Sequence, residues 1–233
     1  MRDDHRPYRL KVLQGKLEAA WVRHFIKPQL EALGHHSMIM KPWNLKLYGR
    51  GISFGTSVHV ITAPDRMVRL TTWAMKEHQG RIDVADSVLI CPGVRIDSAC
   101  QVSIGESTML AAGAYITDAD WHDVYDRTQP IGQTAAVVLE RNVWIGDGAI
   151  VCKGVRIGEN SVIGAGSVVT KRALAVGDTG SSVGGNPVGA LGHELFSALG
   201  LKRNLIEGVF ILCISIAKSS ISGRIKRSVG CAP

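Results

Sequence analysis

The segment 117–138 contains one histidine among several carboxylates. A neutral imidazole near pH 7 can take a proton from an attacking hydroxyl or amine, and an adjacent carboxylate can fix its tautomer and stabilise the imidazolium. His122 is therefore a candidate general base, with Asp120 or Asp118 as the carboxylate behind it. Tyr125, Asp126 and Arg127 follow, and either an acceptor-binding surface or a loop-anchoring ion pair would explain them.

A six-residue period in the chain supplies the frame that must position this segment. Aliphatic residues recur without a gap at Leu139, Ile145, Val151, Ile157, Ile163 and Val169. Three positions after each of the first five stand Asn142, Gly148, Gly154, Asn160 and Gly166. Asn and Gly enter the left-handed region of φ at the least cost, so they suit a sharp corner. A corner every six residues predicts a triangular β-solenoid whose coils bury their apolar residues by stacking.

The same period is present upstream, with interruptions. We expect the coils to begin near Tyr48, with Tyr48, Phe54 and Val60 holding the six-residue phase of the core residues. Gly51, Ser57 and Ala63 are the expected corners of this stretch. A segment containing Arg66, Arg69, Trp73 and His78 breaks the phase and predicts an irregular excursion. The phase resumes at Val84, Ile90, Ile96 and Val102, slips by two at Ile104, and continues through Leu110 and Ile116. It then stops until Leu139, so the histidine lies on a long excursion from a rigid frame, where working residues are common.

Both ends of the chain lie outside the period. Leu10, Leu13, Leu17, Trp21 and Phe25 recur at helical spacing up to Pro28, which predicts a helix that caps the first coil. We divide the chain into a helical cap (1–44), a solenoid (45–175) and a C-terminal extension (176–233). The extension is apolar from Val209 to Ala217 and basic around it. That pattern favours packing, with weak contact to a membrane surface as an alternative.

Composition narrows the class of protein. The 233 residues carry a formal net charge of +7, and much of the surplus lies after residue 200, so nucleic-acid binding is not expected. The five cysteines show no CxxC spacing, and three of them fall inside the repeat, which indicates thiols in a reducing compartment. The polar start of the chain has no apolar signal segment, so we expect a cytoplasmic protein.

The run NVWIGDGAIVCKGVRIGENSVIGAGSVVTK (142–171), together with VLICPGVRI and MLAAGAYITDADWH upstream, resembles the hexapeptide-repeat acetyltransferases. This family includes the maltose and galactoside O-acetyltransferases. The resemblance implies a left-handed parallel β-helix, a homotrimer with active sites between subunits, and acetyl-CoA bound between neighbouring prisms. It implies transfer of an acetyl group to a hydroxyl of a sugar or glycan, without a metal ion.

The same resemblance assigns roles to individual residues. His122 occupies the position of the family's general base. The positions that match the CoA channel are Trp144, Gly146, Ala165, Gly166, Thr170 and Lys171. In sugar-modifying relatives the acceptor is held by an asparagine near Cys91 and an aspartate near Ala99. Neither type is present here, although Asp97 is close, so Cys91 and Asp97 join Asp118, Tyr125, Asp126 and Arg127 as candidate acceptor residues.

Three alternatives remain open at this stage. The acceptor would be an amine if the protein were an N-acetyltransferase for an amino sugar or a xenobiotic. The altered segment after Lys171, with Gly189 where an arginine often stands, would suit a trimeric scaffold that has lost activity. A zinc-dependent prism would require three histidines to converge, and His59, His78 and His122 lack paired spacing.

Overall fold

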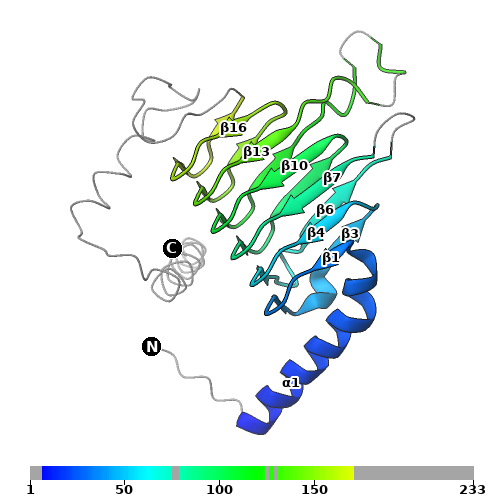
Figure 1. Ribbon diagram of the computed structural model, residues 1–233, viewed down its shortest axis with the longest axis vertical. Helices are drawn as coiled ribbons and strands as arrows, with labels where there is room; N and C mark the ends of the chain where they lie inside the picture. The colour runs from blue at the N-terminus through cyan, green and yellow to red at the C-terminus, as the bar shows by residue number, and fades with distance from the viewer. Residues whose placement is uncertain (1–6, 75–78, 124–125, 129–130, 171–233) are drawn as a thin grey trace, which may run out of the picture. The chain divides into compact units, whose positions relative to one another are not determined.

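The computed structural model describes residues 7–74, 79–123, 126–128 and 131–170, and these residues form a parallel β-helix with three flat sheets (Figure 1). Sheet A contains β1 (Ala32–Leu33), β4 (Ile52–Phe54), β7 (Arg81–Val84), β10 (Gln101–Ile104), β13 (Val137–Leu139) and β16 (Arg156–Ile157). Sheet B contains β2 (Met38–Met40), β5 (His59–Ile61), β8 (Leu89–Ile90), β11 (Met109–Leu110), β14 (Trp144–Ile145) and β17 (Val162–Ile163). Sheet C contains β3 (Leu45–Tyr48), β6 (Val68–Thr72), β9 (Arg95–Ser98), β12 (Tyr115–Thr117), β15 (Ile150–Val151) and β18 (Val168–Val169). The predicted fold class, a left-handed parallel β-helix with an N-terminal helix, is confirmed.

The chain visits sheets A, B and C in turn, so each coil has three corners, and the corner residues follow the sequence pattern. Asn142 and Asn160, at corners between sheets A and B, have φ of 56° and 60°. Gly148 and Gly166, between sheets B and C, have φ of 64° and 68°. Gly154, between sheets C and A, has φ of 72°. All five predicted corners of the regular stretch are therefore left-handed, as their residue types require.

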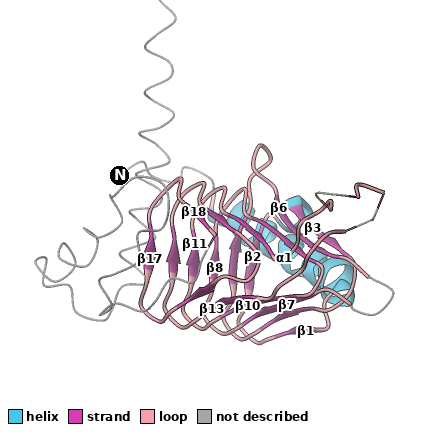
Figure 2. Ribbon diagram, turned by 90° about the horizontal axis from the view of Figure 1, so that it is seen from above, coloured by secondary structure: helices cyan, strands magenta, loops and turns pink. Residues whose placement is uncertain are grey.

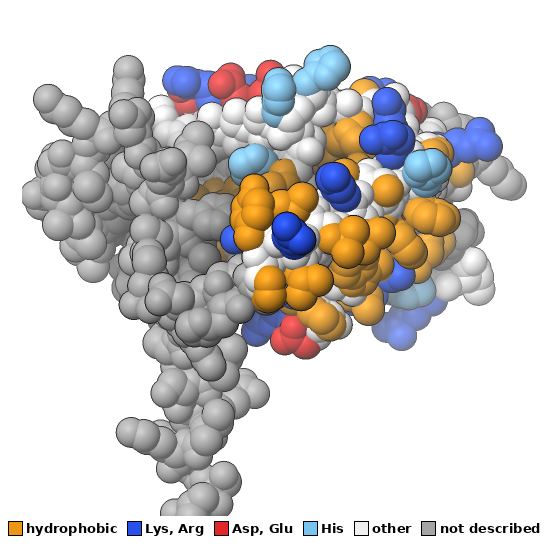
Figure 3. Space-filling model, turned by 90° about the horizontal axis from the view of Figure 1, so that it is seen from below, with side chains coloured by type: hydrophobic (Ala, Val, Ile, Leu, Met, Phe, Trp, Pro, Cys, Tyr) orange, Lys and Arg blue, Asp and Glu red, His pale blue; other side chains and the backbone are white. Residues whose placement is uncertain are grey.

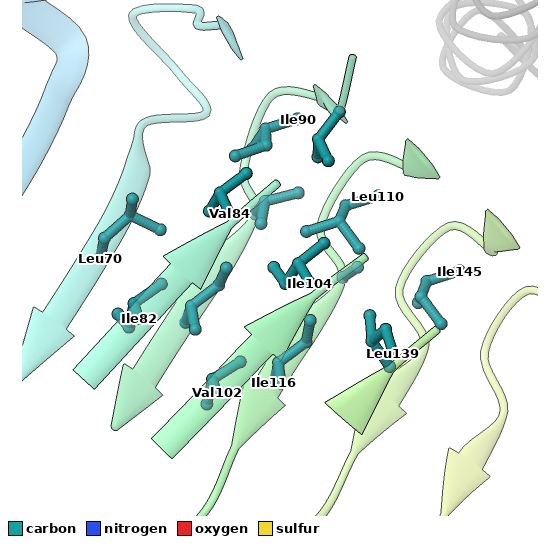
Figure 4. Close-up of a cluster of buried hydrophobic side chains, with 14 of the residues drawn as sticks. Leu70, Ile82, Val84, Ile90, Val102, Ile104, Leu110, Ile116, Leu139 and Ile145 are labelled. Atoms are coloured by element: carbon teal, nitrogen blue, oxygen red, sulfur yellow. The ribbon is translucent and has the colours of Figure 1, made fainter. Parts of the chain in front are cut away.

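The core is a column of aliphatic side chains along the axis of the prism (Figure 4). The six residues that define the period, Leu139 to Val169, are all buried. Phe54 and Val60 are buried as predicted, but Tyr48 is 57% exposed, and the expectation for Tyr48 is wrong. Leu45 and Leu47 fill the core of that strand instead, because Tyr48 is its last residue and points outward.

The first coil begins earlier than residue 45, because β1 and β2 already pair with β4 and β5. The predicted helix is present as α1 (Tyr8–Trp21) and continues as a π-helical turn, η1 (Val22–Ile26). Short 3₁₀ turns follow at η2 (Lys27–Gln29) and η3 (Pro42–Asn44). No residue of α1 is buried, whereas Ile26 of η1 belongs to the core cluster and Val22 packs against it. The capping of the first coil by the helix stays a prediction. Seen from the end where α1 lies, hydrophobic side chains gather beside Lys and Arg (Figure 3).

Departures from the period are concentrated at one edge of the prism, where sheet C passes to sheet A. This edge, which we call the CA edge, is where both excursions leave the coils, after β6 and after β12. The segment around Arg69 was expected to be irregular, yet it forms the regular strand β6, with Val68 and Leu70 fully buried. Ala63, expected at a left-handed corner, is not among the positive-φ residues described. The irregularity is thus confined to a longer turn before β6 and to the excursion after it.

The slip of two at Ile104 also arises at the CA edge. β7 and β10 pair with Ile82 beside Val102, a step of 20 residues, whereas Val138 and Arg156 pair at a step of 18. The strands of the three sheets are visible side by side in Figure 2. Across the part of the chain that is described, no helix has the length and apolar character needed to cross a membrane. The predicted C-terminal extension lies outside the described residues.

Candidate functional site

The long excursion that carries His122 is fixed at its base. Ala119 and Thr134 form an antiparallel bridge, and the backbone N–H of Asp120 donates to the carbonyl of Gln133 at 2.9 Å. Gly132 N–H donates in return to the carbonyl of Asp120 at 2.8 Å. A Cβ on Gly132 would lie 2.9 Å from the carbonyl oxygen of His122, so the two legs of the excursion are in close contact there. The base therefore holds the backbone of His122 against the CA edge.

Asp118 is buried at this base, and both of its carboxylate oxygens accept hydrogen bonds from the neighbouring corner. Its Oδ1 accepts from Ala99 N–H at 2.7 Å, and its Oδ2 accepts from Ser98 Oγ at 2.7 Å and Cys100 N–H at 2.9 Å. Its exposed fraction is 0%. The carboxylate thus closes the corner that contains the two additional residues, and contact with an acceptor, as predicted from the sequence, would require breaking these bonds.

His122 itself is exposed, and within the described residues its imidazole has no hydrogen-bond partner. Asp120 is close in sequence, but its Oδ2 forms an ion pair with Lys153 Nζ from the corner after β15. Oδ1 of Asp120 accepts no hydrogen bond from a described residue. The pairing of Asp120 with His122 stays a prediction, and Lys153 is a third member that the sequence did not indicate.

Aromatic side chains cluster around Trp121, the residue before His122. Trp121 Nε1 donates to Tyr115 Oη at 3.2 Å and to Thr117 Oγ1 at 3.1 Å. The ring of Trp73, at the start of the other excursion, lies 5.7 Å from the ring of Trp121. The guanidinium of Arg95 stacks over Tyr115 at 4.9 Å. The two excursions and the outer face of sheet C thus meet in one aromatic cluster.

The remaining acceptor candidates are distributed along sheet C. Asp97 is 2% exposed and its Oδ2 lies 2.5 Å from Arg95 Nε. Cys91 is buried at the opposite edge, between sheets B and C, which we call the BC edge. In the loop, Asp126 Oδ1 accepts from the backbone N–H of Thr128 at 3.0 Å, and Arg127 is exposed without an ion pair to any described residue. Tyr125 lies outside the described residues.

The candidate CoA residues gather mostly at the BC edge. Gly146 is packed so closely on the next coil that a Cβ there would lie 2.5 Å from Ala165 N. The fold therefore requires a glycine at this position. Gly148 and Gly166 have nothing within 4 Å of a Cβ position, so this edge is open. Ala165 is exposed on the same corner, and Trp144 points outward from β14 and is partly buried. Thr170 follows β18 at the CA edge, and Lys171 lies outside the described residues.

The site does not contain a described metal centre. Among the described residues, no group of three or more His, Cys, Asp or Glu side chains is arranged to hold a metal ion. His59 lies on β5 of sheet B, whereas His122 lies at the CA edge, so one subunit does not bring these two together. His78, the third histidine considered, lies outside the described residues.

Two cysteines beside the site are expected to react slowly with thiol reagents. Burial raises the pKa of the Cys100 thiol, and Asp118 raises it further. Burial and Asp120 likewise raise the pKa of Cys152, against a smaller opposite effect of Lys153. Because the thiolate is the reactive form, both should react more slowly at pH 8 than a free thiol. Mass spectrometry of the labelled peptides over time measures this, and labelling as fast as a cysteine peptide would contradict it.

The ion pair of Lys153 with Asp120 is expected to restrain the excursion locally and to contribute little to the free energy of unfolding. Both side chains are partly exposed, at 28% and 41%, so Lys153→Met should lower the free energy of unfolding by less than about 1 kcal/mol. Local opening should still increase, and trypsin should cleave faster after the exposed Arg127. Lys16→Met on α1 is the matched control. Equal cleavage rates in the two variants would show that the ion pair does not anchor the loop.

Comparisons with known proteins agree with this geometry. The family model for the bacterial transferase hexapeptide (six repeats) matches residues 136–171. The chain is similar to a galactoside O-acetyltransferase from Lactococcus lactis subsp. lactis (strain IL1403), at 30% identity over 149 residues. That alignment covers 63% of this chain and 56% of the relative. Over residues 136–171 the chain is therefore similar to the hexapeptide-repeat transferases.

Two further proteins that are similar to this chain are also named as acetyl- or acyltransferases. A putative lipopolysaccharide biosynthesis O-acetyl transferase, WbbJ, from Escherichia coli (strain K12) is 32% identical over 102 residues, covering 39% of this chain and 52% of that protein. The fold is similar to that of an AntD variant, an N-acyltransferase from Bacillus cereus, with a TM-score of 0.54 at 18% identity. The match covers 76% of this chain and 96% of that one. The chain spans only about half the length of the curated relatives described here.

Proposed function

We propose that this protein transfers an acetyl group from acetyl-CoA to a hydroxyl of a sugar or glycan, with His122 as general base. The observation that carries the proposal is the placement of His122, exposed two residues beyond Asp120, whose backbone is hydrogen-bonded at the base of the excursion on one edge of sheet C. The opposite edge of sheet C, the BC edge, is an open corner lined by Gly148 and Gly166. The names of the sequence relatives, galactoside and lipopolysaccharide O-acetyltransferases, support a saccharide acceptor.

The chain's residues suit an acetyl-CoA co-substrate. The open positions at Gly148 and Gly166 leave room for an extended pantetheine arm to approach the backbone, and Trp144 offers a flat wall beside them. When bound, acetyl-CoA supplies an acyl group already activated as a thioester, so a covalent enzyme nucleophile is not required. We propose that Gly146, Ala165, Thr170 and Lys171 complete this channel.

The role of the protein is then to move one proton and to position the acceptor. The imidazole of His122 takes the proton of the attacking hydroxyl, and Oδ1 of Asp120 holds the ring in the required tautomer. Lys153 holds the other oxygen of Asp120 and so fixes the direction of that carboxylate. The proton leaves His122 with the departing CoA thiol, which balances the transfer. Trp121 and Tyr115 shield this chemistry on one side.

We also propose that the protein works in the cytoplasm as a homotrimer, in which neighbouring prisms close the CoA channel. The outward column of sheet B supports this, because Leu89, Met109 and Trp144 align in register and leave an apolar strip on the prism. Light scattering of the purified protein should give three times the 25.1 kDa chain mass. A monomer that retains full activity would contradict this assembly.

A CoA-release assay tests the function directly. The purified full chain is incubated with acetyl-CoA and a panel of sugars, amino sugars and simple amines, and the product bond is identified by mass spectrometry. We expect an O-acetyl ester on a saccharide. An amide product would replace this proposal with N-acetyl transfer, and absence of CoA binding by calorimetry would identify a scaffold.

A further inference from the structure

The helix α1 and its continuation η1 carry an apolar stripe that is exposed. This helical stripe consists of Leu10, Leu13, Leu17, Trp21 and Phe25, which recur at steps of three and four and therefore share one side of the helix. Their exposed fractions run from 38% to 60%. At 1.5 Å per residue the stripe is about 22 Å long. A surface helix normally turns such a stripe to the core, so this one requires a different partner.

The least exposed side of the same helix begins with polar residues. Between residues 8 and 25, only Gln14, Glu18 and Val22 are not exposed, and they follow one another at steps of four. Gln14 Nε2 donates to Glu18 Oε1 at 2.7 Å. Val22 packs against the core, and Ile26, four residues further, belongs to it. The side that leads into the core therefore starts at Gln14 and Glu18, and folding of the described residues leaves the helical stripe uncovered.

The helical stripe ends in an aromatic cluster. The ring of Phe25 lies 4.5 Å from that of Trp21, and the ring of Trp43, on η3, lies 6.2 Å from Trp21 in an edge-on arrangement at 83°. All three side chains are exposed. Tryptophan is enriched at the headgroup level of bilayers, where one part of the ring contacts apolar chains and the other stays near water.

The residues around the helical stripe are mostly cationic. Residues 8–27 contain five Lys and Arg side chains and one carboxylate, Glu18. Arg9, Lys16 and Arg23 recur at steps of seven and so follow one flank of the stripe. None of these three forms an ion pair with a described residue. Figure 3 shows hydrophobic side chains among Lys and Arg on this face. Long cationic side chains can lay their stems on apolar surface and hold the charge at anionic headgroups.

The sign of the charge distinguishes between possible partners. A second copy of the chain seated on the helical stripe would bring the flanking cations of two helices together, and like-charge repulsion opposes that contact. The chain after residue 200 is also basic, so it would meet the same repulsion. An anionic lipid surface offers an apolar layer for the stripe and negative charge for its flank. An amphipathic helix with Leu, Trp and Phe on one side and Lys and Arg beside them is typical of such surfaces.

We propose that α1 and η1 bind the surface of an anionic membrane. The helical stripe and Trp43 enter the headgroup region, and Arg9, Lys16 and Arg23 contact lipid phosphates. The helix lies along the surface and does not cross it. This inference goes beyond the proposed function, because neither acetyl-CoA nor an acceptor takes part, and its test requires no substrate.

Co-sedimentation of the full chain with lipid vesicles tests the proposal. One set of vesicles is phosphatidylcholine alone, and the other contains about a quarter phosphatidylglycerol. We expect the wild type to bind the anionic vesicles at least about tenfold more tightly than the neutral ones. Leu13→Gln/Leu17→Gln should lose at least about tenfold of the affinity for anionic vesicles. Lys16→Gln/Arg23→Gln should lose about tenfold on anionic vesicles and little on neutral ones.

Met67→Gln/Val168→Gln is the matched control, because both residues are exposed and apolar but lie outside the helix. It should keep the wild-type affinity, and a loss equal to that of Leu13→Gln/Leu17→Gln would show non-specific adsorption and overturn the proposal. Since Leu13 and Leu17 are exposed and glutamine is a good helix former, the leucine variant should keep the wild-type melting temperature.

Three further results would overturn the proposal. One is a wild type that binds neither kind of vesicle. Another is full vesicle binding by Leu13→Gln/Leu17→Gln, which would assign the binding to another surface, such as the basic C-terminal extension. The third comes from light scattering without lipid, where the wild type and the leucine variant should have the same mass. A lower mass for the variant would show that the helical stripe is a contact between copies of the chain.

Discussion

Replacing His122 by alanine should lower kcat for acetyl transfer by a factor on the order of 10²–10⁴, the usual contribution of a general base. The imidazole is exposed and has no hydrogen-bond partner among the described residues, so its removal disturbs no described packing. KM for acetyl-CoA should change little, because the open glycine corner that we assign to CoA lies at the other edge of sheet C. Initial rates of CoA release over a range of both substrates measure the two constants.

His24→Ala is the matched control for this prediction, because His24 is an exposed histidine beyond α1, far in sequence from the excursion. It should retain full turnover. Asp120→Asn should fall between the wild type and His122→Ala, since the amide still occupies the position but no longer stabilises the imidazolium. If His122→Ala kept more than about a tenth of the wild-type kcat, general-base catalysis would be the wrong role for this residue.

The sequence was most informative where the period is unbroken. From Leu139 to Val169 no residue is inserted into the six-residue repeat. The core positions and corners therefore follow directly from residue type. The first coil was misplaced because the period was extended backwards through a corner with two left-handed glycines, Gly49 and Gly51. That corner adds one residue to the six-residue step, so Leu47 rather than Tyr48 aligns with the core residues Leu70 and Ile96.

Candidate site residues were predictable one at a time but not as pairs. His122 stands out by residue type and by its place in a gap of the period. Its neighbours depend on which coil lies above which: Lys153 meets Asp120 across 33 residues of sequence. Arg69, Arg95 and Tyr115 align only once the excursion lengths and the slip at Ile104 are known. Pairing between coils is the information that local spacing does not contain.

Replacing Asp118 by asparagine should destabilise the fold by roughly 2–4 kcal/mol, because buried hydrogen bonds to a charged group are among the strongest single contributions. The three donors at the corner, Ser98 Oγ and the N–H groups of Ala99 and Cys100, approach both carboxylate oxygens. An amide offers one oxygen, and its NH₂ group would face a donor. At least one buried donor is then left without an acceptor. Urea denaturation followed by circular dichroism measures the change.

The same variant separates the structural role of Asp118 from the acceptor-binding role predicted from the sequence. Asp126→Asn is the control, because that carboxylate is exposed on the same excursion, and its free energy of unfolding should change by less than about 1 kcal/mol. If Asp118→Asn unfolded at the wild-type urea concentration but had a raised KM for the acceptor, Asp118 would be an acceptor ligand. The bonds to the corner would then be secondary. The expected result is the opposite: a lower midpoint of unfolding, with loss of activity that follows loss of folded protein, because this buried carboxylate holds the corner beside the base of the excursion that carries His122.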